Sequence, residues 1–265
     1  MAEVAWYDIK AKGWLRDLFI ILHFPYTLWH LAYVFIGAAL APQLNWATLG
    51  WTVWAFFLGM GIGAHCLDEL NGRPLRTKIP GVLLWTLAVV SILGAISIGV
   101  FVGVRESVWV IPCIVFGGFI VFAYNMEWPR DWARFGLFRE LGLVGFFHRD
   151  IWFGFAWGAF PVLTAYIAQT HTLSLTIILV AVACLGYSLV QRMLSTQARF
   201  WRRKVFMLEG HYFTDAPLEP NRPKYDWPQG RVLTKQDIIK PAEVALQCMT
   251  WTVIVAALGL LLLHI

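Results

Sequence analysis

The residues with the clearest capacity for chemistry are His65, Asp68 and Glu69, in the string HCLDELNGRP. They follow Trp46–Ala64 directly, and that run contains no charged residue. On a helix, spacings of three and four place these side chains on one face. Ionisable groups at the end of an apolar membrane helix are costly to bury and are typical of a functional site facing the bundle interior. We therefore expect the chemistry of this protein to take place there.

The elements that must position these residues are membrane-spanning helices. The chain is 59% hydrophobic and only 14% charged, and its apolar runs approach the roughly 20 residues that a helix needs to cross a ~30 Å hydrocarbon layer. Seven spans are predicted: Leu18–Ala41, Trp46–Ala64, Gly81–Val104, Val108–Met126, Ile151–Gln169, Leu173–Val190 and Val244–Leu263. The predicted fold is therefore all-α, a polytopic transmembrane bundle of about seven helices in a single domain, residues 1–265.

Basic residues alternate between the two sides of these spans. Of the 21 Lys and Arg residues, all except Arg105 precede the first span or fall in the loops after the second, fourth and sixth spans. The positive-inside rule then predicts a multi-pass cell-membrane protein with a cytoplasmic amino terminus and an extracytoplasmic carboxyl terminus. The net charge of +5 reflects this topology and gives no indication of nucleic-acid binding. The longest predicted loop, residues 191–243, is cytoplasmic, and its basic start favours contact with anionic membrane lipids.

Two predicted spans carry similar polar stripes at their cytoplasmic ends. The second span ends with His65, Asp68, Glu69 and Gly72, at offsets of 0, 3, 4 and 7. The sixth span ends with polar residues at the same offsets, namely Ser188, Gln191, Arg192 and Ser195. This repetition predicts an old duplication, with the two stripes facing each other inside the bundle.

The order of the spans and the placement of the two stripes resemble the UbiA superfamily of intramembrane prenyltransferases. Members of that family carry aspartate-rich motifs at the cytoplasmic ends of the second and sixth helices. The resemblance runs from Leu22 to about Val205, or roughly two-thirds of the chain. His148–Ala168 is similar to the family's fifth helix, and Tyr124 with Asn125 ends the fourth helix where the family often has a tyrosine.

The resemblance implies a mechanism in which acidic motifs hold magnesium and magnesium holds a prenyl diphosphate. Departure of diphosphate leaves an allylic cation for an acceptor, while an apolar chamber holds the prenyl tail. Carried over to this chain, the resemblance makes Asp68, Glu69 and His65 the catalytic and metal-binding residues. The expected diphosphate-binding residues are Arg73, Arg76, Lys78, Arg192, Arg199, Ser188, Gln191, Ser195 and Asn125.

This chain departs from the family pattern in both motifs. His65 stands in the place of the first aspartate of the first motif, and Gly72 replaces the third. In the second motif Ser188, Ser195 and Arg199 occupy the aspartate positions, so no acid remains there. The family's nine helices are also reduced to seven. Because the second motif has no acid, the usual two-metal chemistry is not expected here.

Three hypotheses follow from these departures. In the first, the protein is a prenyl or isoprenoid-lipid transferase that keeps one magnesium ion on Asp68 and Glu69, with His65 as an optional ligand. Arg192 and Arg199 then bind diphosphate directly, because guanidinium groups pair bidentately with phosphate. In this hypothesis Arg73, Arg76 and Lys78 close over the diphosphate.

In the second hypothesis the fold binds an isoprenoid, quinone or pigment without catalysis, or serves as a subunit beside membrane-protein partners. Asp68 and Glu69 then form structural ion pairs with Arg192 or Arg199. In the third, the His65, Asp68 and Glu69 group joins His148 and Asp150 in a different metal site, since imidazole with carboxylate suits zinc or iron better than magnesium. The lack of a paired histidine spacing in the sequence disfavours this third hypothesis.

Overall fold

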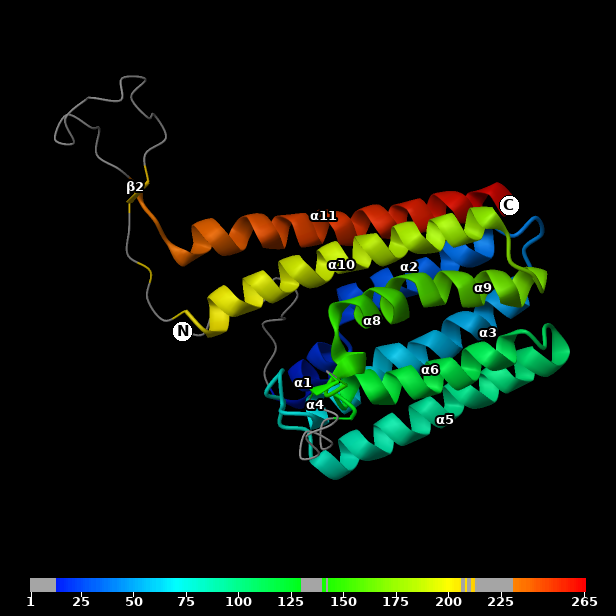
Figure 1. Ribbon diagram of the computed structural model, residues 1–265, viewed down its shortest axis with the longest axis horizontal. Helices are drawn as coiled ribbons and strands as arrows, with labels where there is room; N and C mark the ends of the chain where they lie inside the picture. Colours follow the sequence, from blue (N-terminus) through cyan, green and yellow to red (C-terminus); the bar gives the residue numbers. More distant parts are fainter. Residues whose placement is uncertain (1–12, 130–139, 142, 206–207, 209–210, 213–230) are drawn as a thin grey trace, which may run out of the picture.

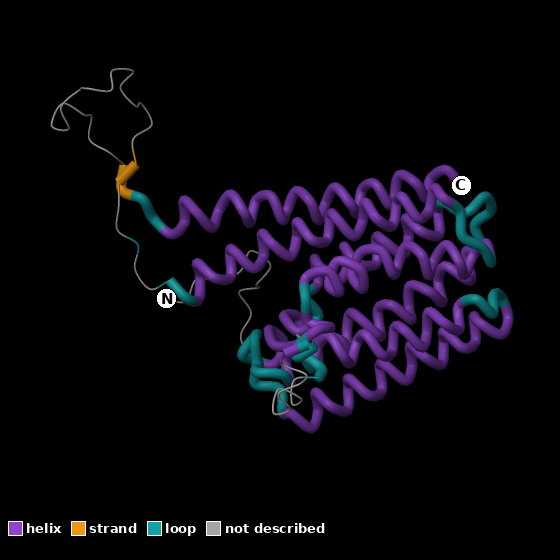
Figure 2. Tube along the Cα trace, in the orientation of Figure 1, coloured by secondary structure: helices purple, strands orange, loops and turns teal. Residues whose placement is uncertain are grey.

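A computed structural model describes residues 13–129, 140–141, 143–205, 208, 211–212 and 231–265. Helices form the bundle, and one antiparallel pair of two-residue strands lies beyond its end (Figures 1 and 2). In chain order the elements are α1 (Trp14–Ile21), α2 (Phe24–Ala39), α3 (Trp46–Phe56), η1 (Phe57–Ala64), α4 (His65–Leu70), α5 (Gly81–Arg105), α6 (Val110–Asn125), η3 (Phe146–His148), α8 (Asp150–Gly154), η4 (Phe155–Ala159), α9 (Phe160–Thr170), α10 (Leu175–Arg203), β1 (His211–Tyr212), β2 (Arg231–Val232), α11 (Lys235–Leu261) and η6 (Leu262–His264).

The helices have the length and composition of membrane spans. Six helical stretches in the described part of the chain are long and apolar enough to cross a membrane, and α6 is a shorter apolar helix of 16 residues. Together they occupy the positions of the seven predicted spans. Large apolar side chains of α5 face outward, with Val82 80% exposed and Val90 64% exposed. Such an apolar exterior is expected where lipid replaces water, so the chain is a multi-pass membrane protein by length and composition.

The first span is broken, although the sequence predicted one continuous helix. α1 ends at Ile21 and α2 begins at Phe24. Between them His23 adopts a left-handed conformation with φ 43° and ψ 46°. Pro25 lies in the first turn of α2, where its missing N–H removes no helical hydrogen bond. The break therefore places the His23 side chain at the turn between the two helices.

The sixth and seventh spans are longer than predicted. α10 continues to Arg203 and α11 begins at Lys235, so both ends of the predicted loop 191–243 are helical. The 29 residues of α10 extend about 43 Å at 1.5 Å per residue, well beyond a ~30 Å hydrocarbon layer. Packing explains the extension, because Nη2 of Arg202 lies 2.6 Å from Oε1 of Glu243 on α11 and Ala198 packs with Ile239 below them.

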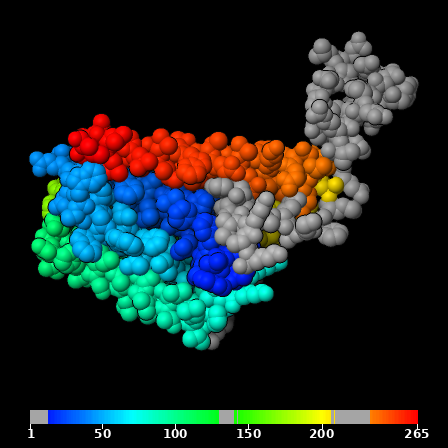
Figure 3. All heavy atoms as spheres, turned by 180° about the vertical axis from the view of Figure 1, so that it is seen from behind, coloured from blue at the N-terminus to red at the C-terminus, as the bar shows by residue number. Residues whose placement is uncertain are grey.

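The bundle is built around α2, which packs against both α9 and α11. Trp29 and Tyr33 of α2 are fully buried. α11 lies along one edge of the bundle and α5 along the opposite edge, as the ribbon and the view from behind both show (Figures 1 and 3). α4, α6 and α10 end, and α5, α8 and α11 begin, at the same end of the bundle (Figure 1). That end is the one to which the sequence assigned nearly all of the basic residues.

Two spans contain wide π-helical turns near this end. η1 immediately precedes His65 in the second span, and η4 interrupts the fifth span. Gly158 in η4 allows α10 to approach closely, because a Cβ atom there would collide with the carbonyl oxygen of Cys184. π-Helical turns are rare and frequently occur at functional sites. The two turns therefore favour a functional site between the second and fifth spans.

Candidate functional site

A cavity of about 340 Å³ opens at the end of the bundle where the second, fourth, fifth and sixth spans meet. Polar side chains from both predicted stripes line it. The predicted site residues that line this cavity are His65, Asp68, Asn125, Gln191, Arg192, Ser195 and Arg199. The expectation that the two stripes face one space agrees with this arrangement, and we call this space the polar cavity.

Asp68 is the carboxylate of the first stripe that lines the polar cavity. Its side chain is half-buried, and it forms no hydrogen bond or ion pair with any other residue that the structure describes. Arg199, His148 and Arg192 lie within electrostatic range of it. Asp68 therefore lies near two arginines and a histidine without forming a hydrogen bond or an ion pair with any of them.

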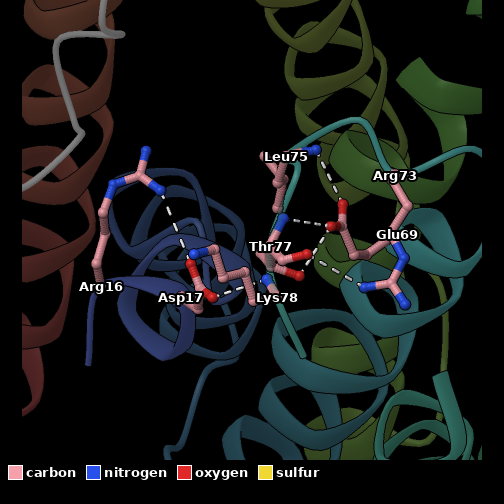
Figure 4. Close-up of polar contacts among 7 residues, drawn as sticks. All are labelled: Arg16, Asp17, Glu69, Arg73, Leu75, Thr77 and Lys78. Carbon is pink, nitrogen blue, oxygen red and sulfur yellow. Dashed lines mark hydrogen bonds and ion pairs between the residues drawn. The ribbon is translucent and has the colours of Figure 1, made fainter. Parts of the chain in front are cut away.

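Glu69 lies next to Asp68 in the chain but does not line the polar cavity. Its side chain is fully buried. Its carboxylate accepts hydrogen bonds from the backbone N–H of Leu75 at 2.9 Å and from the N–H and hydroxyl of Thr77, each at 2.8 Å (Figure 4). Three charge-assisted bonds occupy both oxygens, so Glu69 organises the loop after α4.

The predicted diphosphate clamp of Arg73, Arg76 and Lys78 belongs to the same loop and does not line the polar cavity. Arg73 donates to the carbonyl oxygen of Ile79 at 2.7 Å. It also donates to the carbonyl oxygen of Thr77 at 3.4 Å (Figure 4). The backbone N–H of Lys78 donates to Oδ2 of Asp17 at 2.8 Å, which ties the loop to α1. The side chains of Arg76 and Lys78 are exposed. These hydrogen bonds hold the loop together and fix it to α1, so the loop has a structural role.

Neither Arg192 nor Arg199 forms the structural ion pair that was predicted with Asp68 or Glu69 among the described residues. Nε of Arg192 lies 3.2 Å from Oδ1 of Asp150, and its guanidinium lies over the ring of Phe153, 5.2 Å from the centroid. Arg199 forms no hydrogen bond or ion pair with any described residue. The predicted pairing is therefore wrong among the described residues, because Glu69 is used by the loop and Arg192 by α8.

Of the remaining predicted residues of the second stripe, Gln191 and Ser195 line the polar cavity and Ser188 does not. Gln191 is 5% exposed, and its Oε1 atom has no hydrogen-bond partner among the described residues. Ser195 donates to the carbonyl oxygen of Arg192 at 3.1 Å. Ser188 does not line the polar cavity: it is fully buried and donates to the Tyr33 hydroxyl at 3.2 Å, joining α10 to α2.

Asn125 lines the polar cavity at the end of α6, but its amide is partly used by its own helix. Nδ2 donates to the carbonyl oxygen of Val121 at 2.7 Å, and the backbone carbonyl of Asn125 accepts from Asn71 at 3.1 Å. Oδ1 of Asn125 is the atom left for a ligand. The Asn125 side chain thus bonds to its own helix and also lines the cavity.

Two histidines present the same ring nitrogen for reaction. Nδ1 of His65 lies 3.0 Å from the carbonyl oxygen of Gly61, and Nδ1 of His148 lies 2.8 Å from that of Tyr124. A carbonyl oxygen only accepts, so Nδ1 carries the proton and Nε2 holds the lone pair in the neutral ring. The His148 ring stacks on Tyr124 with centroids 4.7 Å apart. Both histidines line the polar cavity.

Several lining residues were not assigned to the site from the sequence. The most informative are Tyr124 and Trp157, since the Tyr124 hydroxyl and Trp157 Nε1 are buried without a hydrogen-bond partner among the described residues. Arg202 and Arg203 add positive charge to the cavity wall. The basic run that contains these two arginines could be recognised in the sequence. Because the run was predicted to lie in a loop, it was not possible to infer which of its side chains line the cavity.

The three residues expected to share a metal ion do not form a metal site. No group of three or more His, Cys, Asp or Glu side chains within the described residues is arranged to hold an ion. Glu69 has both oxygens occupied, and Nδ1 of His65 is bonded to the backbone. Magnesium prefers oxygen ligands in octahedral geometry, and Asp68 alone supplies one from this motif. The donor set therefore does not fit a magnesium site on these three residues, and no step below uses one. The set that includes His148 and Asp150 is not assembled either.

A second cavity, of about 100 Å³, adjoins the polar cavity and lies among the second to fifth spans. We call it the apolar cavity, because its walls are aliphatic, aromatic and small side chains from the second to fifth spans. Four residues line both spaces, namely Met60, Ile120, Val121 and Ala156. Phe160 forms part of the apolar wall near Gly117. The two cavities thus meet across one shared wall.

Comparison of the chain with protein-family models, curated proteins and solved structures gave no match.

Proposed function

We propose that this protein is a UbiA-like membrane transferase that uses a prenyl diphosphate as donor. The observation that carries the proposal is the junction of the basic polar cavity with the apolar cavity at Met60, Ile120, Val121 and Ala156. A ligand that fills both spaces must have an anionic head and a hydrocarbon tail. Prenyl diphosphates have this form, and the resemblance of the helix order to prenyltransferases points to the same class.

The charge of the polar cavity favours a diphosphate head group. Arg192, Arg199, Arg202 and Arg203 line it, whereas its carboxylates are Asp68 and Glu127. Guanidinium groups bind phosphate oxygens through paired, charge-assisted hydrogen bonds. The Tyr124 hydroxyl, which lacks a described partner, is a further donor for the same oxygens.

The proposed reaction breaks the bond between C1 of the prenyl chain and the bridging diphosphate oxygen. The electron pair leaves with diphosphate, where the arginines stabilise the added negative charge. An acceptor then forms a bond to C1 and gives up a proton. Nε2 of His148 is positioned to take that proton, because Nδ1 is fixed on the Tyr124 carbonyl and Asp68 lies within electrostatic range to stabilise the imidazolium.

The basic end of the bundle is proposed to face the cytoplasm of a cell membrane, with the amino terminus on that side and the carboxyl terminus outside. The support is the distribution of Lys and Arg along the chain. The head group would then enter from the cytoplasmic face, and the tail would extend toward the membrane interior.

A second candidate is a non-catalytic isoprenoid-binding protein or a subunit beside membrane-protein partners. The observation in its favour is that Glu69 serves the loop and leaves Asp68 as the one carboxylate of the first motif in the cavity. Both candidates require ligand binding, and they differ in turnover.

The test uses the purified protein in detergent with geranylgeranyl diphosphate, geranylgeraniol and inorganic diphosphate. Binding to the folded state raises the melting temperature by mass action. We expect geranylgeranyl diphosphate to raise it more than either fragment, because only the whole molecule fills both cavities. Equal effects from inorganic diphosphate, or none from any compound, would contradict the proposal. Incorporation of labelled prenyl groups into membrane lipids then separates the transferase from the binding protein.

A further inference from the structure

We infer that arginine side chains of α10 bind the diphosphate head group directly, without a divalent metal ion, with Arg199 as the principal ligand. This inference rests on the proposed function. It also reverses the cofactor that the family resemblance implies, because magnesium is expected there to join the protein to the diphosphate.

The two carboxylates of the first motif have different surroundings. Glu69 is fully buried, its two oxygens accept three hydrogen bonds from the loop, and it does not line the polar cavity in which the diphosphate is proposed to bind. Asp68 remains in the polar cavity as a single carboxylate. In a metal-free site Asp68 repels the diphosphate, whereas in a metal site it would attract the ion that holds it.

The guanidinium groups are arranged to replace the metal. Arg192 and Arg199 lie seven residues apart on α10, which places them on one face, roughly 10 Å apart along the axis. Ser195 lies between them, and all three line the polar cavity. Two cations at this separation can approach a diphosphate from both of its ends.

Arg199 is the more available of the two arginines. It has no hydrogen bond or ion pair with a described residue, so binding an anion costs it no existing contact. Arg192 is bonded to Asp150, whose side chain is 68% exposed. An exposed ion pair of this kind is weak, and Arg192 can exchange it for a phosphate oxygen.

This arrangement predicts the sign of the magnesium effect. A protein that holds diphosphate through a metal binds it more tightly as magnesium is added. Here magnesium in solution neutralises the free diphosphate and competes with the guanidinium groups for the same oxygens, so binding becomes weaker. Adding EDTA to a magnesium-free sample should then leave the affinity unchanged, and adding it to a sample that contains magnesium should restore the tighter binding.

The experiment measures the affinity of the purified full chain for geranylgeranyl diphosphate in EDTA and in millimolar magnesium. The variants are Arg199→Gln, Arg199→Lys and Asp68→Asn, with Arg105→Gln as the matched control because Arg105 is exposed at the far end of α5, outside both cavities. In EDTA we expect Arg199→Gln to weaken binding at least tenfold, Arg199→Lys to weaken it less and Arg105→Gln to leave it unchanged. Asp68→Asn should tighten binding.

Binding by the wild type that appears only with magnesium, or its loss in Asp68→Asn, would overturn the metal-free site. Equal weakening by Arg199→Gln and Arg105→Gln would overturn the role of Arg199, since it would reflect net charge alone. If the wild-type protein binds geranylgeranyl diphosphate in neither condition, the proposed function itself fails. Binding that needs magnesium leaves the proposed function standing and removes only this inference.

Discussion

Asp68 and Glu69 are neighbours in the chain, yet their carboxylates serve different structures. Asp68 faces the polar cavity without a partner among the described residues, while Glu69 is buried and binds the loop between α4 and α5. Successive residues on a helix point about 100° apart, so a one-residue step changes the surroundings completely. We therefore expect Glu69 to contribute mainly to the stability of the fold and Asp68 mainly to ligand binding.

Substitution of Glu69 is expected to destabilise the protein, and substitution of Asp68 is not. Glu69→Ala leaves the N–H groups of Leu75 and Thr77 and the Thr77 hydroxyl without their acceptor, at a cost of about 3 kcal/mol or more. Asp68→Asn should change the free energy of unfolding by less than about 0.5 kcal/mol. Thermal unfolding in detergent without ligand checks both, and equal losses in the two variants would contradict the division of roles.

The pair between Arg192 and Asp150 predicts a gain of affinity on removing the acid. Asp150→Asn releases Arg192 from its 3.2 Å contact and lets it bind the ligand from the outset. Because an exposed ion pair contributes up to about 1 kcal/mol, affinity for geranylgeranyl diphosphate should rise by up to about fivefold. Glu106→Gln removes a carboxylate from the far end of α5 and serves as the control. Weaker binding in Asp150→Asn would show that the acid supports the site.

Ala156 lies in the wall that the two cavities share. It is 7% exposed and lines both of them, so Ala156→Leu places a larger side chain at the junction. We expect this variant to lose affinity for geranylgeranyl diphosphate while its affinity for inorganic diphosphate stays unchanged. A titration with donors of increasing chain length measures the effect. Equal affinity of variant and wild type for all chain lengths would place the tail elsewhere.

His148 is expected to affect turnover more than binding. His148→Asn retains an amide donor for the Tyr124 carbonyl but lacks the Nε2 lone pair, and general-base catalysis typically contributes about 10²–10⁴-fold. Labelled prenyl transfer in membranes containing the protein should fall accordingly, with the affinity for donor preserved. His171→Asn is the control, because His171 is exposed between α9 and α10 and its left-handed φ of 60° suits asparagine. Unchanged transfer in His148→Asn would exclude His148 as the base.

Two glycines on packed helices test the arrangement of the fifth and sixth spans. A Cβ atom at Gly158 would collide with the backbone of Cys184, whereas one at Gly186 meets nothing within 4 Å. Gly158→Ala should therefore destabilise the bundle by about 1–3 kcal/mol through overpacking. Gly186→Ala should stabilise α10 by up to about 1 kcal/mol. Unfolding measurements on the two variants should give shifts of opposite sign, and a matching sign would contradict the close packing.

The class of fold and the polar end of the bundle could be predicted from the amino-acid sequence alone. Apolar length and the placement of Lys and Arg are local properties, so the seven helical positions and the end that carries Asp68 and Arg192 could be predicted from them. Helix limits beyond the hydrocarbon layer could not, because the end of α10 depends on packing against α11 through Arg202 and Glu243.

The tertiary structure decided which polar residues form a site. The sequence places Glu69 beside Asp68, but only the fold of the loop brings Leu75 and Thr77 to its carboxylate and removes it from the cavity. In the same way, Tyr124 and His148 are 24 residues apart and become neighbours because α6 ends where α8 begins. Hydrogen bonds and close packing between distant segments are set by three-dimensional contact, and spacing along one helix does not contain that information.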